Sequence, residues 1–317
     1  MKTVYTKCAQ NMKALVKQKQ MPDIGRITLF DVTLRDGLQG LTKDQQTKYS
    51  LQDKMKLYTT IKTLYEPEAI EIGSIVNENV LPIFKDTLEF FDSINHPKKI
   101  VENNLEDMDY TNHYILIPSK EKLSVILNNP KVNNLSFITS VSNSFQLKNT
   151  KKTLEQGDKE IYEMLYMLDE HKCRLYPPQI KLYVSCINEC PIEGRIENDI
   201  IVDRLLQLQK MNVDNICISD TCGTLEPSDF EYIVTTGQTN GLNLSKVSLH
   251  LHVKNGRECV VESIIHTALD KNIRRFDVSL LQYGGCSVTM DATKLAANLS
   301  YDLFYSSLYN YIIKRTT

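Results

Sequence analysis

Residues 246–256 read KVSLHLHVKNG, an apolar run that carries two histidines and ends in lysine, asparagine and glycine. In a β-strand the side chains alternate between two faces, so His250 and His252 lie on one face and the apolar residues around them lie on the other. The polar, turn-forming residues directly after the run place both imidazoles near the carboxyl end of the strand. The stretch therefore predicts a buried strand that aims two histidines at one place.

The rest of the chain from Arg26 alternates short β-rich runs with helix-period segments, the first of which is a long amphipathic helix over residues 43–65. This alternation is typical of βα units around a parallel sheet. Eight such units, without a G-x-G-x-x-G or Walker sequence, favour an α/β fold of the (βα)₈ TIM-barrel class over an open doubly wound sheet. The predicted strands are Ile27–Leu34, Ala69–Ser74, Tyr114–Pro118, Leu135–Val141, Ile180–Ile187, Asn215–Thr221, Val247–Val253 and Arg275–Leu281.

We expect an N-terminal extension over residues 1–25 and a single catalytic barrel domain over residues 26–317, because no linker separates a second domain. The extension contains lysines but no arginine before Arg26. Mitochondrial presequences prefer arginine, so a cytoplasmic protein is the favoured interpretation and the mitochondrial matrix is the alternative.

Composition excludes several classes of protein. The 317 residues are 42% hydrophobic and carry a net charge of −2, with a pI of about 6.3, so neither nucleic acid nor an anionic membrane is the expected partner. No apolar run approaches the roughly 18 residues of a membrane span, which predicts a soluble protein. Eight cysteines in a chain of this length are too sparse for a disulfide scaffold and lack paired zinc-finger spacing, which favours reduced thiols inside a cell.

The carboxyl ends of the predicted strands carry the polar residues that a barrel active site needs. Asp36 follows the first strand in the sequence LRDG, and with His250 and His252 it offers one oxygen and two imidazole ligands. Such a set leaves about half of an octahedral shell open for substrate and water. It suits Mg²⁺ or Mn²⁺ as a Lewis acid, while Zn²⁺ and Fe²⁺ remain open on these ligands alone.

Five motifs, in order and at matching spacing, resemble the 3-hydroxy-3-methylglutaryl-CoA lyases. They are DVTLRDGLQG, YVSCINECPIEGRI, ISDTCGTLEPSD, LHLH and YGGCSV. The RDG and H-x-H elements occur throughout the wider superfamily of metal-dependent lyase and synthase barrels, whereas YVSC with CP-x-EG and the later GGC resemble the lyase branch. The resemblance implies a divalent-metal-dependent carbon–carbon lyase that cleaves 3-hydroxy-3-methylglutaryl-CoA, or a similar 3-hydroxyacyl-CoA, to acetoacetate and acetyl-CoA.

The resemblance also implies roles for single residues. Arg35 would stabilise the negative charge that grows on the thioester oxygen, with a salt bridge to Glu71 as its structural alternative. Glu71 and Asp220 are acid, base or orienting candidates. Ser185 and Thr221 are candidate hydroxyl donors to the substrate carboxylate.

Cys286 follows two glycines in the GGC motif. By the same resemblance it lies on a flexible lid over the site and takes part in proton transfer to the acetyl-CoA carbanion.

Three positions depart from the family pattern. Val253 and Lys254 follow the H-x-H pair where an acidic or amide residue is usual, and Leu295 stands where the family places an asparagine ligand. Asn298 is then the candidate fourth ligand, with Asp291 as another oxygen donor nearby. The departures keep two alternatives open: a condensing or aldolase-type enzyme of the isopropylmalate or homocitrate synthase kind, and a catalytically impaired metal-binding paralogue. We expect a homodimer that acts on an acyl-CoA or hydroxy-acid substrate.

Overall fold

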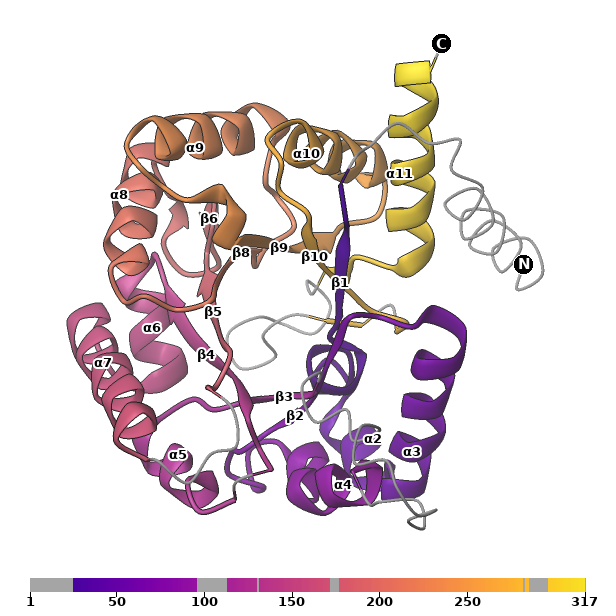
Figure 1. Cartoon of the computed structure of the whole chain (residues 1–317), viewed down its shortest axis with the longest axis vertical. Helices are drawn as coiled ribbons and strands as arrows, with labels where there is room; N and C mark the ends of the chain where they lie inside the picture. Colours follow the sequence, from indigo (N-terminus) through magenta and orange to yellow (C-terminus); the bar gives the residue numbers. More distant parts are fainter. Residues whose placement is uncertain are drawn as a thin grey trace.

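Eight parallel strands form a closed ring in which each strand is hydrogen-bonded to two neighbours, and the helices surround the ring (Figure 1). The computed structural model describes residues 25–95, 113–129, 131–171, 177–281, 283–284 and 296–316. The ring closes where β10 pairs with both β1 and β9. Its strands are β1 (Thr28–Asp31), β2 (Ala69–Ser74), β3 (His113–Leu116), β4 (Asn134–Ser140), β5 (Ile180–Ser185), β8 (Asn215–Asp220), β9 (Val247–Val253) and β10 (Arg275–Val278).

This arrangement is the (βα)₈ barrel that the sequence predicts, and all eight predicted strands are present. Several predicted strand ends were placed too late, including those at Pro118 and Leu281, where β3 ends at Leu116 and β10 at Val278. The first strand stops at Asp31, because the chain turns into the π-helical segment η1 (Thr33–Gly37). The fifth stops at Ser185, because Cys186 adopts a φ of 65°, which no strand can contain.

The helices lie outside the ring, and the segment predicted as one long helix over residues 43–65 is interrupted. Ser50 breaks it because its hydroxyl accepts a hydrogen bond from the Asp53 amide, which starts a new helix. The helical segments are α2 (Lys43–Lys48), α3 (Leu51–Thr60), η2 (Ile61–Tyr65), η3 (Pro82–Phe84), α4 (Thr87–Ile94), α5 (Lys120–Ile126), α6 (Asn143–Thr150), α7 (Leu154–Glu170), α8 (Asn198–Gln209), α9 (Pro227–Thr239), η6 (Leu244–Lys246), α10 (Glu258–Asp270) and α11 (Tyr301–Thr316).

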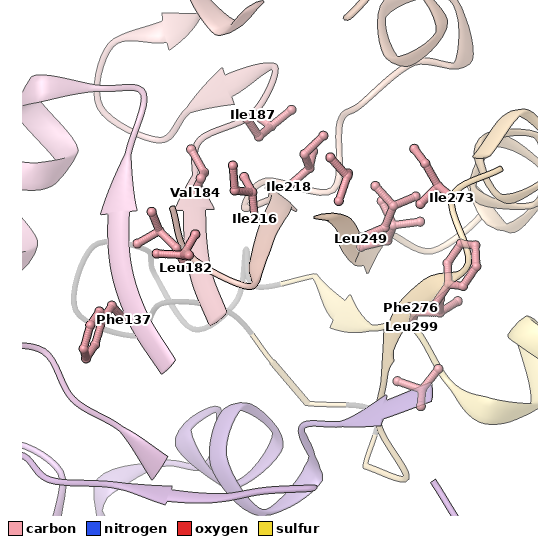
Figure 2. Packing of buried hydrophobic residues seen from close by; sticks show 14 of the residues in the cluster. Phe137, Leu182, Val184, Ile187, Ile216, Ile218, Leu249, Ile273, Phe276 and Leu299 are labelled. Carbon is pink, nitrogen blue, oxygen red and sulfur yellow. The ribbon is translucent and has the colours of Figure 1, made fainter. Parts of the chain in front are cut away.

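The main hydrophobic core lies between the outer faces of the strands and the helices (Figure 2). Leu182, Leu249 and Phe276, from three different strands, are each fully buried in it. Truncation of such a side chain to alanine costs about 2–5 kcal/mol of unfolding free energy. The alternate residues of the same strands point into the barrel, where only small apolar clusters occur and polar groups gather.

Two short pairings occur outside the ring. β11 (Ala297–Asn298) runs antiparallel to the end of β9 and places Asn298 opposite His252. β6 (Glu189–Cys190) and β7 (Gly194–Arg195) form a small hairpin after β5. Within the described ranges, no helix has the length and apolar character needed to cross a membrane.

Candidate metal centre and substrate pocket

A pocket of about 440 Å³ opens at the carboxyl ends of the strands. One wall is polar and the other is apolar. The polar wall contains Arg35, Asp36, Tyr183, Ser185, Thr221, His250 and His252. The apolar wall contains Val76, Val80, Leu81, Leu116, Ile138 and Phe145.

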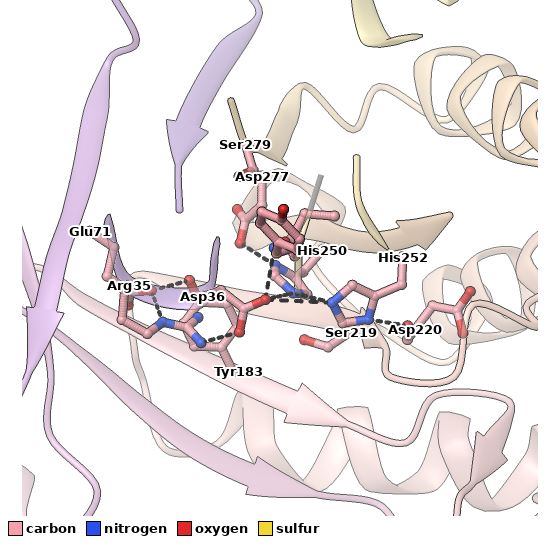
Figure 3. A network of polar contacts seen from close by, with 12 residues as sticks. Arg35, Asp36, Glu71, Tyr183, Ser219, Asp220, His250, His252, Asp277 and Ser279 are labelled. Carbon is pink, nitrogen blue, oxygen red and sulfur yellow. Dashed lines mark hydrogen bonds and ion pairs between the residues drawn. The ribbon is translucent and has the colours of Figure 1, made fainter. Parts of the chain in front are cut away.

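Asp36 and the two histidines meet at the base of the polar wall (Figure 3). The Asp36 Oδ2 atom lies 3.8 Å from His250 Nε2 and 3.6 Å from His252 Nε2, and the two Nε2 atoms are 3.3 Å apart. All three residues are buried. Asp36 and the two histidines are more than 200 positions apart in the sequence. The fold nevertheless brings their three predicted ligand atoms to one point.

The separations of these atoms fit a small divalent cation. A point equidistant from all three lies roughly 2.1 Å from each, which is the length of the bonds that Mg²⁺ and Zn²⁺ form with oxygen and imidazole ligands. Mn²⁺ accepts the same mixed oxygen and nitrogen set. The three residues therefore have the composition and spacing of a metal site, without selecting one metal.

The Nδ1 atom of each imidazole has a hydrogen-bond partner on the side away from the pocket. His252 Nδ1 lies 2.9 Å from the carbonyl oxygen of Asp220, and His250 Nδ1 lies 3.0 Å from Asp277 Oδ2. A carbonyl can only accept, so His252 keeps its proton on Nδ1. The carboxylate of Asp277 likewise accepts from His250, so both Nε2 lone pairs face the pocket. At 3.3 Å two such lone pairs repel unless a proton or a cation lies between them.

Electrostatics distinguish the members of the cluster. Burial lowers the pKa of His250, while for His252 the burial effect is outweighed by the hydrogen bond to Asp36 and its charge, which raise the pKa. Burial alone would raise the pKa of Asp36, but Arg35 and the imidazoles hold it well below its usual value. Asp36 is therefore anionic at neutral pH.

Arg35 bridges two carboxylates. Its Nε donates to Glu71 Oε2 at 2.5 Å and its Nη1 donates to Asp36 Oδ1 at 2.5 Å. The guanidinium also lies 5.0 Å from the ring centre of Tyr183, whose hydroxyl donates to the same Glu71 oxygen at 3.0 Å. Among the described residues, Arg35 Nη2 has no assigned acceptor. The salt bridge from Arg35 to Glu71 and the contact of Arg35 with Asp36 are thus both present.

Of the remaining predicted site residues, Ser185 and Thr221 line the pocket, whereas the carboxylate of Asp220 is engaged elsewhere. It accepts the amides of Thr224 and Leu225 at 3.0 and 3.1 Å, and burial raises its pKa to about 6. Asp220 thus contacts His252 through its backbone and not through its carboxylate. Glu71 is fully buried behind Arg35, where it can orient the guanidinium.

Asn298 approaches the cluster from β11. Its Nδ2 lies 2.9 Å from Asp36 Oδ2 and 2.8 Å from the carbonyl oxygen of Tyr283, while its buried Oδ1 has no hydrogen-bond partner in the described part of the chain. A Cβ atom at Gly284 would lie 2.5 Å from Asn298 Nδ2, so only glycine permits this approach. In this orientation the amide nitrogen faces Asp36, so ligation of a cation by Oδ1 would require the Asn298 amide to turn over.

Cys286, Asp291 and Leu295 lie outside the described residues, so their predicted roles stay predictions. Of the other two departures, Val253 pairs with Ala297 in the β9–β11 ladder. Lys254 Cγ lies 3.3 Å from where a Cβ atom at Gly223 would be, so its stem runs beside this glycine.

Comparison with known families decides the relationship. A family model described as HMGL-like matches residues 26–311, which is most of the chain. The chain belongs to the HMGL-like family.

Known HMGL-like relatives are similar at low identity. The 3-hydroxy-3-isohexenylglutaryl-CoA/hydroxymethylglutaryl-CoA lyase of Pseudomonas aeruginosa is 22% identical over 88% of this chain and 84% of its own length. The hydroxymethylglutaryl-CoA lyase of Pseudomonas mevalonii is 21% identical over 88% of this chain and 83% of its own. A solved HMG-CoA lyase from Acinetobacter baumannii, in complex with coenzyme A and 3-methylmalate, has a TM-score of 0.73 at 23% identity and covers 94% of this chain and 86% of that one. These likenesses support the fold and an enzyme of the HMGL-like superfamily.

Sequence reasoning missed three residues of this HMGL-like site, Lys181, Tyr183 and Asp277. Each lies on a strand and points into the barrel, in line with its inward-facing neighbours such as Ser185 and His250. The alternation of side chains along a strand could have identified them, because the period-two pattern that points the histidines inward also applies to IKLYVS and RFDV. The predicted site residues lie at the strand ends, whereas these three lie deeper in the barrel.

Proposed function

We propose that this protein is a divalent-metal-dependent carbon–carbon lyase that cleaves 3-hydroxy-3-methylglutaryl-CoA or a similar 3-hydroxyacyl-CoA. The observation that carries the proposal is the convergence of Asp36, His250 and His252 beside Arg35 at the base of one pocket. A bound divalent cation would supply Lewis-acid activation of the substrate's hydroxyl and carboxylate oxygens.

The reaction breaks the bond between C2 and C3 of the acyl chain. The tertiary hydroxyl loses its proton and becomes the ketone oxygen of acetoacetate, while the bonding pair stays on C2 as the enolate of acetyl-CoA, which then takes up a proton. Arg35 Nη2, which has no acceptor among the described residues, belongs to a guanidinium fixed by Glu71 and Asp36 and is suited to hold the negative charge on the thioester oxygen. A preorganised donor of this kind is worth about 10²–10³ in rate.

The pocket has partners for both ends of such a substrate. Ser185 and Thr221 line the polar wall and offer hydroxyls to its carboxylate. The apolar wall, with Lys122 and Lys152 also lining the pocket, suits the alkyl and anionic parts of an acyl-CoA. Support for the thioester also comes from the coenzyme A in the similar solved structure and from the substrates that the relatives' names state.

The direct test is an assay of the purified protein with Mn²⁺ and 3-hydroxy-3-methylglutaryl-CoA, in which acetoacetate is followed. We expect turnover that His250→Ala abolishes. Cys286→Ala tests the lid cysteine separately, because loss of activity in the histidine variant alone would remove Cys286 from the mechanism.

Two other results would replace the proposal. Turnover of a 2-oxo acid together with acetyl-CoA, without thioester cleavage, would identify a condensing enzyme. Mn²⁺ binding with no carbon–carbon cleavage of any thioester tested would identify an impaired paralogue.

A further inference from the structure

Lys181 lies inside the barrel, where a charged side chain is costly to bury. Its side chain is 3% exposed, and its Nζ contacts Asp277 Oδ1 at 2.5 Å. The same nitrogen lies 3.5 Å from the ring centre of Phe30 and 4.6 Å from that of Tyr183. Two aromatic faces and one carboxylate therefore fix the ammonium group in place.

Asp277 connects this lysine to the candidate metal centre. Its Oδ1 accepts the Lys181 ammonium. Its Oδ2 accepts His250 Nδ1 at 3.0 Å, as Figure 3 shows. Cys217 Sγ also lies 3.7 Å from Oδ2. Both oxygens are engaged, and the carboxylate is 1% exposed, so it has little freedom to rotate.

The consequence falls on His250. A carboxylate that accepts from Nδ1 leaves the Nε2 lone pair pointing at Asp36 and His252, and it fixes the plane of the ring. His252 receives the equivalent support from a backbone carbonyl, which is held by the strand itself. Only the His250 support depends on a side chain whose charge needs its own partner.

We propose that Lys181 and Asp277 are positioning residues that hold His250 in the metal-binding tautomer and orientation, with Lys181 acting through Asp277. This inference rests on the metal centre of the proposed function. Neither residue is one of the three proposed metal ligands. Neither belongs to the strand-end motifs of the sequence analysis.

Charge explains why the lysine is needed. The cluster contains the carboxylates of Asp36, Glu71 and Asp277, and Arg35 compensates the first two by direct contact. Lys181 is the cation in contact with the third. Without it Asp277 would be a buried and uncompensated charge, which the fold relieves by moving the side chain or admitting water. Either response releases His250.

The experiment is calorimetric titration of Mn²⁺ into the metal-free protein and its variants, which needs no substrate. Lys181→Met is expected to weaken Mn²⁺ binding by about 10–100-fold, the effect typical of a lost support behind a ligating histidine. Lys181→Arg restores a cation that can contact Asp277 and is expected to retain most of the affinity. Asp277→Ala removes the acceptor itself and is expected to weaken binding at least as much as Lys181→Met.

Lys54 provides a matched control. Its buried side chain forms an ion pair with Asp86 and donates to the Ile83 carbonyl in the helical layer, away from the pocket. Lys54→Met is expected to lower thermal stability while leaving the Mn²⁺ affinity unchanged. A loss of affinity in this variant equal to that in Lys181→Met would mean that general destabilisation explains both, and would overturn the proposal.

The outcomes separate the two inferences. No Mn²⁺ binding by the wild-type protein would overturn the metal centre and this proposal together, whereas unchanged affinity in Lys181→Met would overturn the positioning role alone. If Lys181→Met does not fold, ¹⁵N spectra of histidine-labelled, metal-free wild-type protein decide the question, with the His250 signals assigned by a His250→Gln variant. We expect a proton on His250 Nδ1, and a proton on Nε2 with none on Nδ1 would overturn the proposal.

Discussion

Replacement of Arg35 by lysine keeps the positive charge but removes the fork that bridges Glu71 and Asp36. One ammonium nitrogen cannot occupy the positions of both Nε and Nη1, each of which forms a 2.5 Å contact in a buried setting. The variant therefore loses one charge-assisted hydrogen bond, which is worth about 1.5–3 kcal/mol. We expect urea unfolding to show a loss of that size in the free energy of unfolding.

The catalytic effect of Arg35→Lys should be larger than the effect on stability. Loss of the Nη2 donor is expected to lower kcat by about 100-fold or more in the acetoacetate assay. Arg257→Lys is the matched control, because Arg257 pairs with the half-exposed Glu226 and should change stability by less than about 1 kcal/mol. An Arg35→Lys variant with unchanged stability and unchanged kcat would refute the bridging role.

Three further predictions follow from other contacts. Burial raises the pKa of Asp31 to about 7 from 3.8, so the folded protein holds a proton that the unfolded chain releases, and stability should fall as pH rises from about 4 to 7, by on the order of 4 kcal/mol in full. Between pH 5 and pH 8, urea unfolding should show about 2.6 kcal/mol of this loss, so the wild type should lose that much more stability than Asp31→Asn, and equal losses in the two proteins would contradict the assignment. Asn298→Ala should weaken Mn²⁺ binding by about tenfold in calorimetry, and unchanged affinity would exclude it as a ligand. Mn²⁺ at 100 times its Kd should raise the free energy of unfolding by about 2.7 kcal/mol, reversibly with a chelator, and the same gain in His250→Ala would place the ion elsewhere.

The sequence predicts the barrel because strand and helix periods alternate eight times, and it predicts the metal triangle because strand ends share one face of a barrel. His250 and His252 need only the period of a strand to be placed on one side. The approach of Asp36 to the histidines depends in addition on closure of the ring. In the closed ring β10 lies between β1 and β9, so the ends of β1 and β9 are close to each other.

Other features depend on contacts that no local pattern encodes. The η1 turn that carries Arg35 and Asp36 is helical, although Thr33 and Leu34 at its start continue the β-rich run of the predicted strand. The place of Asp220 at a strand end predicts an acid, base or orienting role, whereas Ser219 holds the inward position of β8 and lines the pocket. The alternation of the strand could have shown this. The support of His250 by Asp277 and Lys181 joins three strands, and a single sequence gives no distance between strands.

The most direct test of the central claim is anomalous X-ray diffraction from crystals grown with Mn²⁺. We expect one strong manganese peak at roughly 2.1–2.3 Å from an Asp36 oxygen and from His250 and His252 Nε2, with the substrate side of the ion open to the pocket. A manganese peak bound by other residues, or saturating Mn²⁺ with no peak between these three side chains, would contradict the account.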